Sequence, residues 1–220
     1  LVAEQVYEKE KSNSTMINIL SHIVEFRNGE SGLHVLHIQT LTDILLHTLV
    51  QQTDRYKLTA ADISLISTAS ALHDIGKINI PESILNKPGK LTQEEFGIMK
   101  THTTIGDKIL HELPFEQDAP LVKTARQICR WHHERWDGRG YPDGLKGREI
   151  PLSAQIAALA DVYDALTSER PYKEPYSHEK AVSMILAGEC GAFSDTMLEV
   201  FEKVSKVFPQ FKAEEGAESY

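Results

Sequence analysis

The sequence predicts an all-α fold, a bundle of about seven or more helices. Apolar residues recur at intervals of three and four along most of the chain, which is the helical period. Threonines followed three positions later by an acidic residue are typical of helix starts. No segment shows the alternating pattern of a half-buried strand, so we expect no sheet.

The first two predicted helices cover about residues 2–26 and 33–49. The first is strongly charged in its first half, "VAEQVYEKEK". The second carries a largely apolar face, made of Leu33, Leu36, Thr40, Leu41, Ile44, Thr48 and Leu49. The glycine-containing stretch "NGESG" between them is typical of a loop.

Helix starts are predicted along the rest of the chain by capping residues. Thr59 with Asp62, and Thr92 with Glu95, fit capping boxes. Pro120 favours the first turn of a helix that runs into the double histidine at 132–133. One side of that helix is apolar: Leu121, Val122, Ala125, Ile128 and Cys129. A later helix repeats the pattern with Ile156, Leu159, Ala160 and Tyr163, and Ser177 is typical of a further N-cap.

We expect one main domain with short appendages. Residues 1–28 are predicted to form an N-terminal helical segment, residues 29–210 the main domain and residues 211–220 a frayed tail. The chain opens without Met, so we expect it to be a piece of a longer protein. The charged first helix then either links to an upstream receiver or sensor domain, pairs with a second copy as a homodimer, or is simply solvated.

The composition narrows the classes of partner. The chain has 23 basic and 32 acidic residues and a net charge of −9, which disfavours binding to nucleic-acid polymers. A small phosphate ligand could still be held by a local basic pocket or by metal ions. The two cysteines, Cys129 and Cys190, show no zinc or disulfide spacing, which favours a reducing, cytoplasmic setting. No apolar run is long enough for a membrane span, and no signal peptide is visible.

Histidines and carboxylates are the candidate chemical groups. His73 and Asp74 are neighbours, so a site between their directions is within reach of both, and one Asp can bridge two ions while each His holds one. Glu30 and His34 are four apart and share a helical face if the helix has begun by Glu30. The other candidates are His102, His132, His133 and Asp161. Imidazole and carboxylate without thiolate suit iron, manganese or zinc. Each residue alone also fits a plainer role as a surface acid, a helix-end residue or a satisfied core histidine.

The motifs taken together resemble the HD-GYP family, a branch of the HD-domain metal phosphohydrolases. The similarity is carried by "HDIGK" from His73, "IPESILNKPGKLTQEEFGIMKTH" up to His102, "HHERWDGRGYP", and "DVYDALTSERPYK". It covers about residues 30–173 in order and without large gaps. The resemblance implies an all-helical fold, which agrees with the periodicity. It also implies hydrolysis of the bacterial second messenger cyclic di-GMP to pGpG and often on to GMP.

The resemblance also implies a metal centre. Its ligands fall on His34, His73, Asp74, His102, His132, His133 and Asp161, with Asp74 as the bridging carboxylate. Glu30 matches the acidic ligand of members that hold three ions, so we expect two or three divalent ions, most of all iron, with manganese as the alternative. The family often has Arg three residues after its first ligand, whereas this chain has His37. That change either weakens a contact near His34 or has no effect.

Substrate contacts are implied by the same resemblance. Arg170 and Lys173 match a basic pair that holds a substrate phosphate, and Lys77 points to the same phosphate region and to a catalytic role. Gly140, Tyr141 and Pro142 shape a loop in which Tyr141 stacks on a guanine or donates to a phosphate. Two other functions stay open: a phosphohydrolase for another cyclic dinucleotide, and a cyclic di-GMP sensor with little turnover.

Overall fold

The structure is a computed structural model of the chain. It describes all residues except 1, 29–32, 115–117, 170–173 and 208–220. Its described residues form helices and loops and contain no strand, which confirms the all-α prediction. The first half holds α1 (Val2–Arg27), α2 (Leu33–Gln52), α3 (Ala60–Ser70), the 3-10 helix η1 (Ile75–Asn79), α4 (Glu82–Leu85) and α5 (Gln93–Lys100). The second half holds α6 (His102–His111), α7 (Pro120–Trp131), the 3-10 helix η2 (Gly147–Glu149), α8 (Leu152–Thr167), α9 (His178–Leu186) and α10 (Asp195–Ser205).

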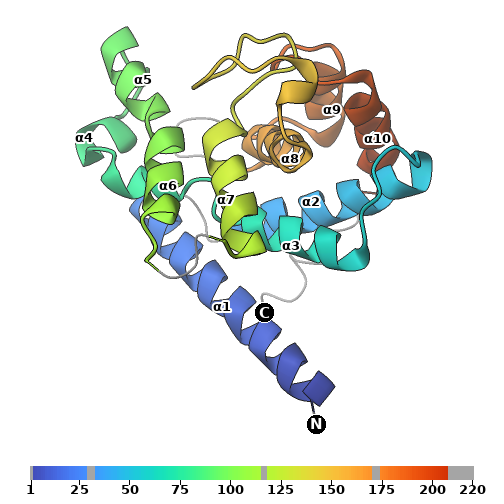
Figure 1. Ribbon diagram of the computed structural model, residues 1–220. Helices are drawn as coiled ribbons and strands as arrows, with labels where there is room; N and C mark the ends of the chain where they lie inside the picture. The colour runs from blue at the N-terminus through green and yellow to red at the C-terminus, as the bar shows by residue number, and fades with distance from the viewer. Residues whose placement is uncertain (1, 29–32, 115–117, 170–173, 208–220) are drawn as a thin grey trace, which may run out of the picture.

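Helix α8 lies at the centre of the bundle (Figure 1). It packs against α2, α7, α9 and α10, and α2 also packs against α10. Helix α7 also packs against α3 and α6, and η1 packs against α6. The centre therefore brings together elements that are far apart in the sequence. Helix α1 extends from this body, and its N-terminal half points away from the other helices (Figure 1).

A single hydrophobic core joins these helices. Its largest fully buried side chains are Tyr163, Phe201, Ile38, Leu45, Leu46, Leu49, Ile80, Ile128, Ile156, Leu159, Ile185 and Met197. The rings of Tyr163 and Phe201 meet edge-to-face with centroids 5.7 Å apart, a favourable aromatic geometry. Burying such a side chain contributes about 1.5–3 kcal/mol to stability, so this core fixes the helices that carry the polar centre.

The helix starts agree with the predictions from the sequence. Thr59 and Thr92 accept hydrogen bonds from the backbone N–H groups of Asp62 and Glu95, and both capping boxes are complete. Pro120 occupies the first turn of α7, and the Ser177 side chain caps α9. The predicted first helix, 2–26, corresponds to α1.

The predicted apolar face of the second helix was partly wrong. Leu33 and Leu36 are 50% and 43% exposed. The buried residues of α2 are instead His34, Val35, Ile38, Leu41, Thr42, Leu45, Leu46 and Leu49. Residue periodicity fits both faces, because leucines lie on each of them. Contacts between His34 and residues of α8 decide which face of α2 points inward. These partners cannot be identified from the local sequence.

Three short helices and one cap were not predicted. Helices η1, α4 and η2 are too short to show a helical period, and Ser194, which caps α10, was not recognised. None of the described helices is both long enough and apolar enough to cross a membrane.

Gly76 lets η1 approach α6 closely. A Cβ atom at this position would overlap the backbone carbonyl of His102 and the backbone nitrogen of Gly106. Glycine is therefore required by space here, since any side chain would separate the two elements. The close approach places Asp74, just before η1, beside His102, the first residue of α6.

Candidate metal centre

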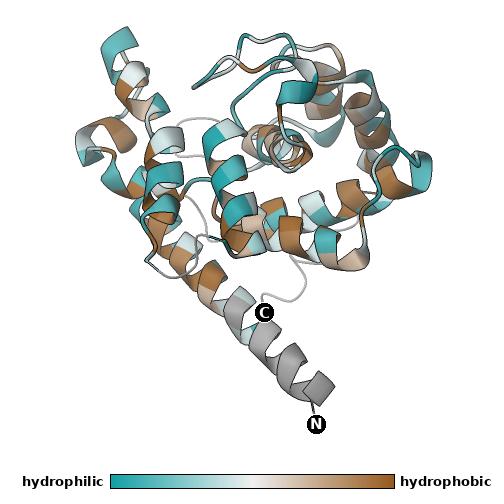
Figure 2. Ribbon diagram, in the orientation of Figure 1, coloured by the Kyte–Doolittle hydropathy of each residue, from teal (hydrophilic) through white to brown (hydrophobic). Residues whose placement is uncertain are grey.

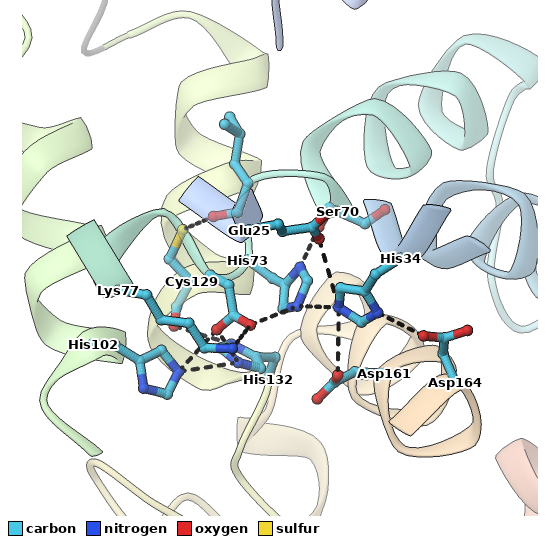
Figure 3. A network of polar contacts seen from close by, with 12 residues as sticks. Glu25, His34, Ser70, His73, Lys77, His102, Cys129, His132, Asp161 and Asp164 are labelled. Carbon is cyan, nitrogen blue, oxygen red and sulfur yellow. Dashed lines mark hydrogen bonds and ion pairs between the residues drawn. The ribbon is translucent and has the colours of Figure 1, made fainter. Parts of the chain in front are cut away.

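Seven of the predicted ligands come from five regions of the fold. His34 lies on α2, Asp161 on α8 and His102 at the start of α6. His73 and Asp74 occupy the turn between α3 and η1, and His132 and His133 follow the end of α7. The side chains of His34, His73, His102, His132 and Asp161 point into one space between the helices (Figure 3).

The side chains form two groups of ligand atoms. One consists of His34, His73 and Asp74, the other of His102, His132 and His133, and within each group the atoms lie within 4.8 Å of one another. Asp74 lies between them. Its Oδ2 is 3.2 Å from His73 Nε2, and its Oδ1 is 3.2 Å from His102 Nε2 and 3.8 Å from His132 Nε2. One carboxylate therefore faces both groups, each with a different oxygen.

The one predicted ligand of these seven outside the two groups is Asp161, whose Oδ1 is 4.0 Å from His34 Nε2. Asp161 thus faces the His34 group. Within the second group, His133 stacks on the ring of Tyr141, with centroids 4.7 Å apart, and meets the His102 ring edge-on at 5.1 Å. His133 therefore links that group to the glycine-rich loop.

The histidine tautomers are fixed by their outer partners. Nδ1 of His73, His102 and His132 lies 3.0, 2.8 and 2.9 Å from the carbonyl oxygens of Ser70, Met99 and Ile128. A carbonyl can only accept, so each Nδ1 carries the proton. When these rings are neutral, each Nε2 is therefore a bare lone pair. The lone pairs of His102 and His132 face each other, with the Nε2 atoms 3.5 Å apart. His73 Nε2 lies 3.4 Å from His34 Nε2.

The electrostatics of the centre favour a positive charge. Burial lowers the pKa of His132 to about 3, helped by the neighbouring His73. Burial also lowers the pKa of His102 and His133. His73 is the exception, because Asp74 outweighs the effect of burial and raises the pKa of His73 to about 9. The hydrogen bond to Asp164 also raises the pKa of His34 against the effect of burial. The lowered pKa values of His102, His132 and His133 favour the neutral imidazoles that bind a cation.

These residues fit divalent metal ions. Imidazole nitrogens held in one tautomer by an outer acceptor are typical of metal ligands. Asp74 Oδ1 is buried and accepts no hydrogen bond from the described residues, although it faces two imidazole nitrogens. A cation between these atoms would offset the repulsion between the nitrogen lone pairs. It would also compensate the charge of the buried Asp74 carboxylate. Nitrogen and oxygen donors without thiolate suit iron, manganese or zinc.

The glycine-rich loop is folded back onto the double histidine. Tyr141 donates its backbone N–H to His133 O at 3.2 Å. A Cβ at Gly140 would overlap the backbone of Glu134 and Arg135, so the predicted close approach of this glycine is confirmed. The buried carboxylate of Glu134 accepts from the backbone N–H groups of Asp143 and Gly144, at 2.7 and 3.0 Å. The loop is thus built to hold Tyr141 against His133.

Two lysines lie near the centre. Lys77 Nζ is 2.7 Å from Asp74 Oδ2. The lysine predicted to contact a substrate phosphate therefore also contacts a predicted metal ligand. Lys77 and His73 hold the pKa of Asp74 well below its usual range although burial opposes this. Lys100 Nζ lies over the rings of Phe96 and Tyr141, at 5.3 and 5.6 Å from their centroids. Three of the predicted residues, Glu30, Arg170 and Lys173, lie outside the described residues.

Sequence reasoning missed several residues of the centre. Asp164 is 1% exposed, and its carboxylate accepts from Nδ1 of His34 at 2.6 Å and Nδ1 of His37 at 2.7 Å. His37 therefore keeps a hydrogen bond in the outer layer of the centre, on the same carboxylate as His34. The hydrogen bond from His34 lowers the pKa of Asp164, whose burial acts the other way. Its signal in the sequence was the spacing of three from Asp161, which places both on one helical face.

Glu25 is the other residue of the centre that sequence reasoning missed. Its carboxylate lies 3.9 Å from His34 Nε2.

Comparison with known proteins identifies relatives of this chain. The model of the HD domain family matches residues 14–190. A cyclic di-GMP phosphodiesterase of Vibrio cholerae is 41% identical over 204 residues, covering 91% of this chain and 41% of the relative. A 3'3'-cGAMP-specific phosphodiesterase of the same organism is 38% identical over 192 residues, covering 87% and 34%. This chain spans less than half the length of these curated relatives.

A solved structure shares the fold. It is the structure of a protein from Bdellovibrio bacteriovorus described as an HDG"Y"P protein, with a TM-score of 0.60 and 19% identity, covering 93% of this chain and 68% of that one. At this identity the likeness concerns the fold alone.

The helical bundle and its buried histidine–carboxylate centre define the class of HD domains, which bind divalent metal ions. The chain belongs to the HD domain family and, within it, to the HD-GYP branch.

Proposed function

We propose that this chain is a metal-dependent phosphodiesterase domain that hydrolyses cyclic di-GMP to pGpG, and pGpG further to GMP. The observation that carries the proposal is the position of Asp74, whose two oxygens face two separate groups of histidines. That arrangement suits a pair of ions, which is typical of phosphoester hydrolysis. The names of relatives at 41% identity, from Vibrio cholerae and Thermotoga maritima, support the choice of cyclic di-GMP.

The proposed ligands are divided between the ions. His34, His73 and Asp161 face one position, and His102, His132 and His133 face the other, with Asp74 between them. Glu30 is proposed as a further ligand that allows a third ion. Iron is the preferred metal and manganese the alternative, since the donors are imidazole and carboxylate. When bound, such ions activate water for attack on phosphorus and offset the charge on phosphate oxygens.

The chain's own cations and loop would position the substrate. Lys77 already lies within the centre, 2.7 Å from an oxygen of Asp74, so it can reach a phosphate held there. Arg170 and Lys173 are proposed to hold the same phosphate, because two basic residues offset the charge that gathers on its oxygens. Tyr141 is held by His133 and is proposed as a wall of the substrate pocket. These local cations matter because the whole chain is acidic, with a net charge of −9.

The proposal is tested by product analysis. The chain, loaded anaerobically with Fe²⁺ or with Mn²⁺, is incubated with cyclic di-GMP, 3'3'-cGAMP and nucleoside triphosphates, and the products are separated. We expect pGpG and GMP from cyclic di-GMP, and loss of both turnover and metal in the H73A/D74A double variant. Full hydrolysis by that variant would contradict the proposal.

A second candidate substrate is 3'3'-cGAMP, because one of the relatives is named as a phosphodiesterase specific for it. The 3'3'-cGAMP-specific phosphodiesterase is 38% identical, close to the value for the cyclic di-GMP enzymes. Faster turnover of 3'3'-cGAMP in the same panel would assign the chain to that substrate. Binding of cyclic di-GMP without turnover would instead identify a sensor.

We also propose that α1 pairs with α1 of a second copy. Its exposed apolar residues Met16, Ile19, Ile23 and Phe26 are separated by three, four and three positions, which is the heptad spacing of a coiled coil. They are between 54% and 80% exposed. Figure 2 shows hydrophobic residues along the C-terminal half of α1. A parallel pair would cover this stripe in both chains.

A further inference from the structure

Glu25 is a buried acid near the end of α1. It is 4% exposed, and its Oε1 lies 3.9 Å from His34 Nε2, as Figure 3 shows. This buried carboxylate thus lies beside an imidazole nitrogen of the metal centre. The position of this acid calls for a role in that centre.

The nitrogen that Glu25 faces is the one that is available for a metal. Nδ1 of His34 is engaged by Asp164 at 2.6 Å, so Nε2 is the atom that faces inward. Asp161 Oδ1 approaches the same Nε2 at 4.0 Å, and His73 Nε2 approaches it at 3.4 Å. Side chains from α1, α8 and the turn after α3 therefore all approach the same nitrogen of His34, within 4.0 Å.

These separations match ligands of a common ion. Metal–ligand bonds of this type are about 2.1 Å long, so two ligand atoms of one ion are at most about 4.2 Å apart. The distances from His34 Nε2 to Glu25, Asp161 and His73 all lie below that limit. Glu25 is thus close enough to share an ion with His34 without any change of backbone.

Arg27 holds the end of α1, which carries Glu25, against the segment after Asp74. Its guanidinium donates to the carbonyl oxygens of Lys77, at 3.1 Å, of Ile80, at 3.0 Å, and of Ile78. In return Asn86 donates its side-chain N–H to Arg27 O at 3.0 Å. The end of α1 is therefore joined to η1, the segment that directly follows Asp74. Charged donors make such hydrogen bonds strong.

We propose that Glu25 supplies an oxygen ligand to the ion on the His34 side, which makes α1 a structural part of the metal centre. The inference rests on the metal-dependent function proposed above and adds a ligand outside the HD-GYP motifs, distinct from Glu30. A hard divalent ion such as Mn²⁺ or Fe²⁺ is the class of cation that a carboxylate favours here. Binding of that ion and docking of α1 are then linked, so each strengthens the other.

Titration with Mn²⁺ alone tests the inference without any substrate. The metal-free chain is titrated with Mn²⁺, and free Mn²⁺ is followed by electron paramagnetic resonance. In Glu25→Gln, which keeps the size of the side chain and removes its charge, we expect one fewer ion, or at least about tenfold weaker binding of one ion. Glu199→Gln, an acid on the outer side of α10, is the matched control and should titrate like the wild type. Unchanged number and affinity of ions in Glu25→Gln would overturn the inference.

Thermal unfolding of the metal-free chain distinguishes a role of Glu25 as a metal ligand from a purely structural role. We expect the metal-free midpoint of Glu25→Gln to equal that of the wild type or to rise, because a buried charge has been removed. A fall in that midpoint with Mn²⁺ binding intact would show a purely structural role and overturn the inference. If Glu25→Gln does not fold, Arg27→Ala decides, since it keeps every proposed ligand side chain, releases the end of α1 that carries Glu25 and should weaken binding of the same ion. A wild type that binds Mn²⁺ but hydrolyses no cyclic dinucleotide would contradict the proposed function and leave this inference standing.

Discussion

Asp164 on α8 accepts a hydrogen bond from Nδ1 of His34 on α2 at 2.6 Å, across 130 positions of sequence. The same carboxylate accepts from Nδ1 of His37 at 2.7 Å and from the Ser168 hydroxyl at 2.8 Å. The first bond makes His34 present Nε2 to the centre, and it raises the pKa of His34 although burial opposes this. Asp164 is thus a positioning residue for a proposed ligand.

Asp164→Asn should weaken metal binding. One amide NH₂ replaces an accepting oxygen, so His34 or His37 loses its acceptor and His34 is no longer held in one tautomer. Loss of such an outer partner typically lowers metal affinity about 10–100-fold. Titration with Mn²⁺ measures this change. Ser168→Ala, which removes a donor to Asp164 but keeps the carboxylate, should bind the metal like the wild type. Equal affinities in all three proteins would show that Asp164 does not position His34.

Gly76→Ala should disturb the contact between η1 and α6. The added Cβ overlaps the backbone carbonyl of His102, and backbone cannot move as a flexible side chain does. We expect a loss of about 1–3 kcal/mol in the free energy of unfolding, together with weaker metal binding, because Asp74 and His102 are moved apart. Denaturant unfolding measures the first effect.

Gly97→Ala is the matched control for that substitution. Gly97 lies within α5, and nothing lies within 4 Å of a Cβ placed there. Ala is the better helix former, so the variant should gain about 0.5–1 kcal/mol. Equal destabilisation by both variants would mean that the close approach at Gly76 is not what matters.

The sequence predicts the fold well where the signal is local. Capping pairs such as Thr59 with Asp62 satisfy the first backbone N–H groups within one turn, so their pattern is visible in the chain. The exposed Leu33 and Leu36 show the limit. Their spacing fits an apolar face, yet the partners on α8 rotate α2 to bury His34.

The candidate site is predicted only in part, because some of its residues leave no local pattern in the sequence. The HD-GYP motifs point to seven ligands, and the structure brings all seven into one space. Glu25 and Arg27 could not be predicted, because nothing in "EFR" shows that the end of α1 turns back onto η1. Their partners are the carbonyls of Lys77, Ile78 and Ile80, and such backbone groups carry no sequence signal.

Cys129 should be unreactive in the native protein. It is fully buried, its thiol donates to Leu72 O at 3.0 Å, and burial raises its pKa, so the reactive thiolate is absent near neutral pH. A thiol reagent at pH 8 should label at most Cys190 before denaturation and both cysteines after it. The variant C190S should show no label in the native state. Two thiols labelled at one rate in the native wild type would contradict this burial.

The stripe on α1 predicts a dimer that a single charge can dissociate. Ile19→Glu places a carboxylate in the middle of the proposed helix pair, where burial of an unpaired charge is unfavourable. Light scattering on a sizing column should show a dimer for the wild type and a monomer for the variant. Thr15→Glu, also exposed on α1 but outside the heptad positions, should leave the mass unchanged. A monomeric wild type would show that this stripe is not covered by a second copy of the chain.

Metal removal should lower the thermal stability of the chain. Without ions, the Nε2 atoms of His102 and His132 face each other at 3.5 Å, and Asp74 Oδ1 accepts no hydrogen bond from the described residues. A metal at 100 times its dissociation constant stabilises the folded state by about 2.7 kcal/mol. For a chain of this size that corresponds to about 5–10 °C in the unfolding midpoint. Thermal unfolding with Mn²⁺ and with chelator measures the difference. The H73A/D74A variant is the control and should unfold at the same temperature with Mn²⁺ and with chelator. A shift in that variant equal to the wild-type shift would place the stabilising ion outside this centre.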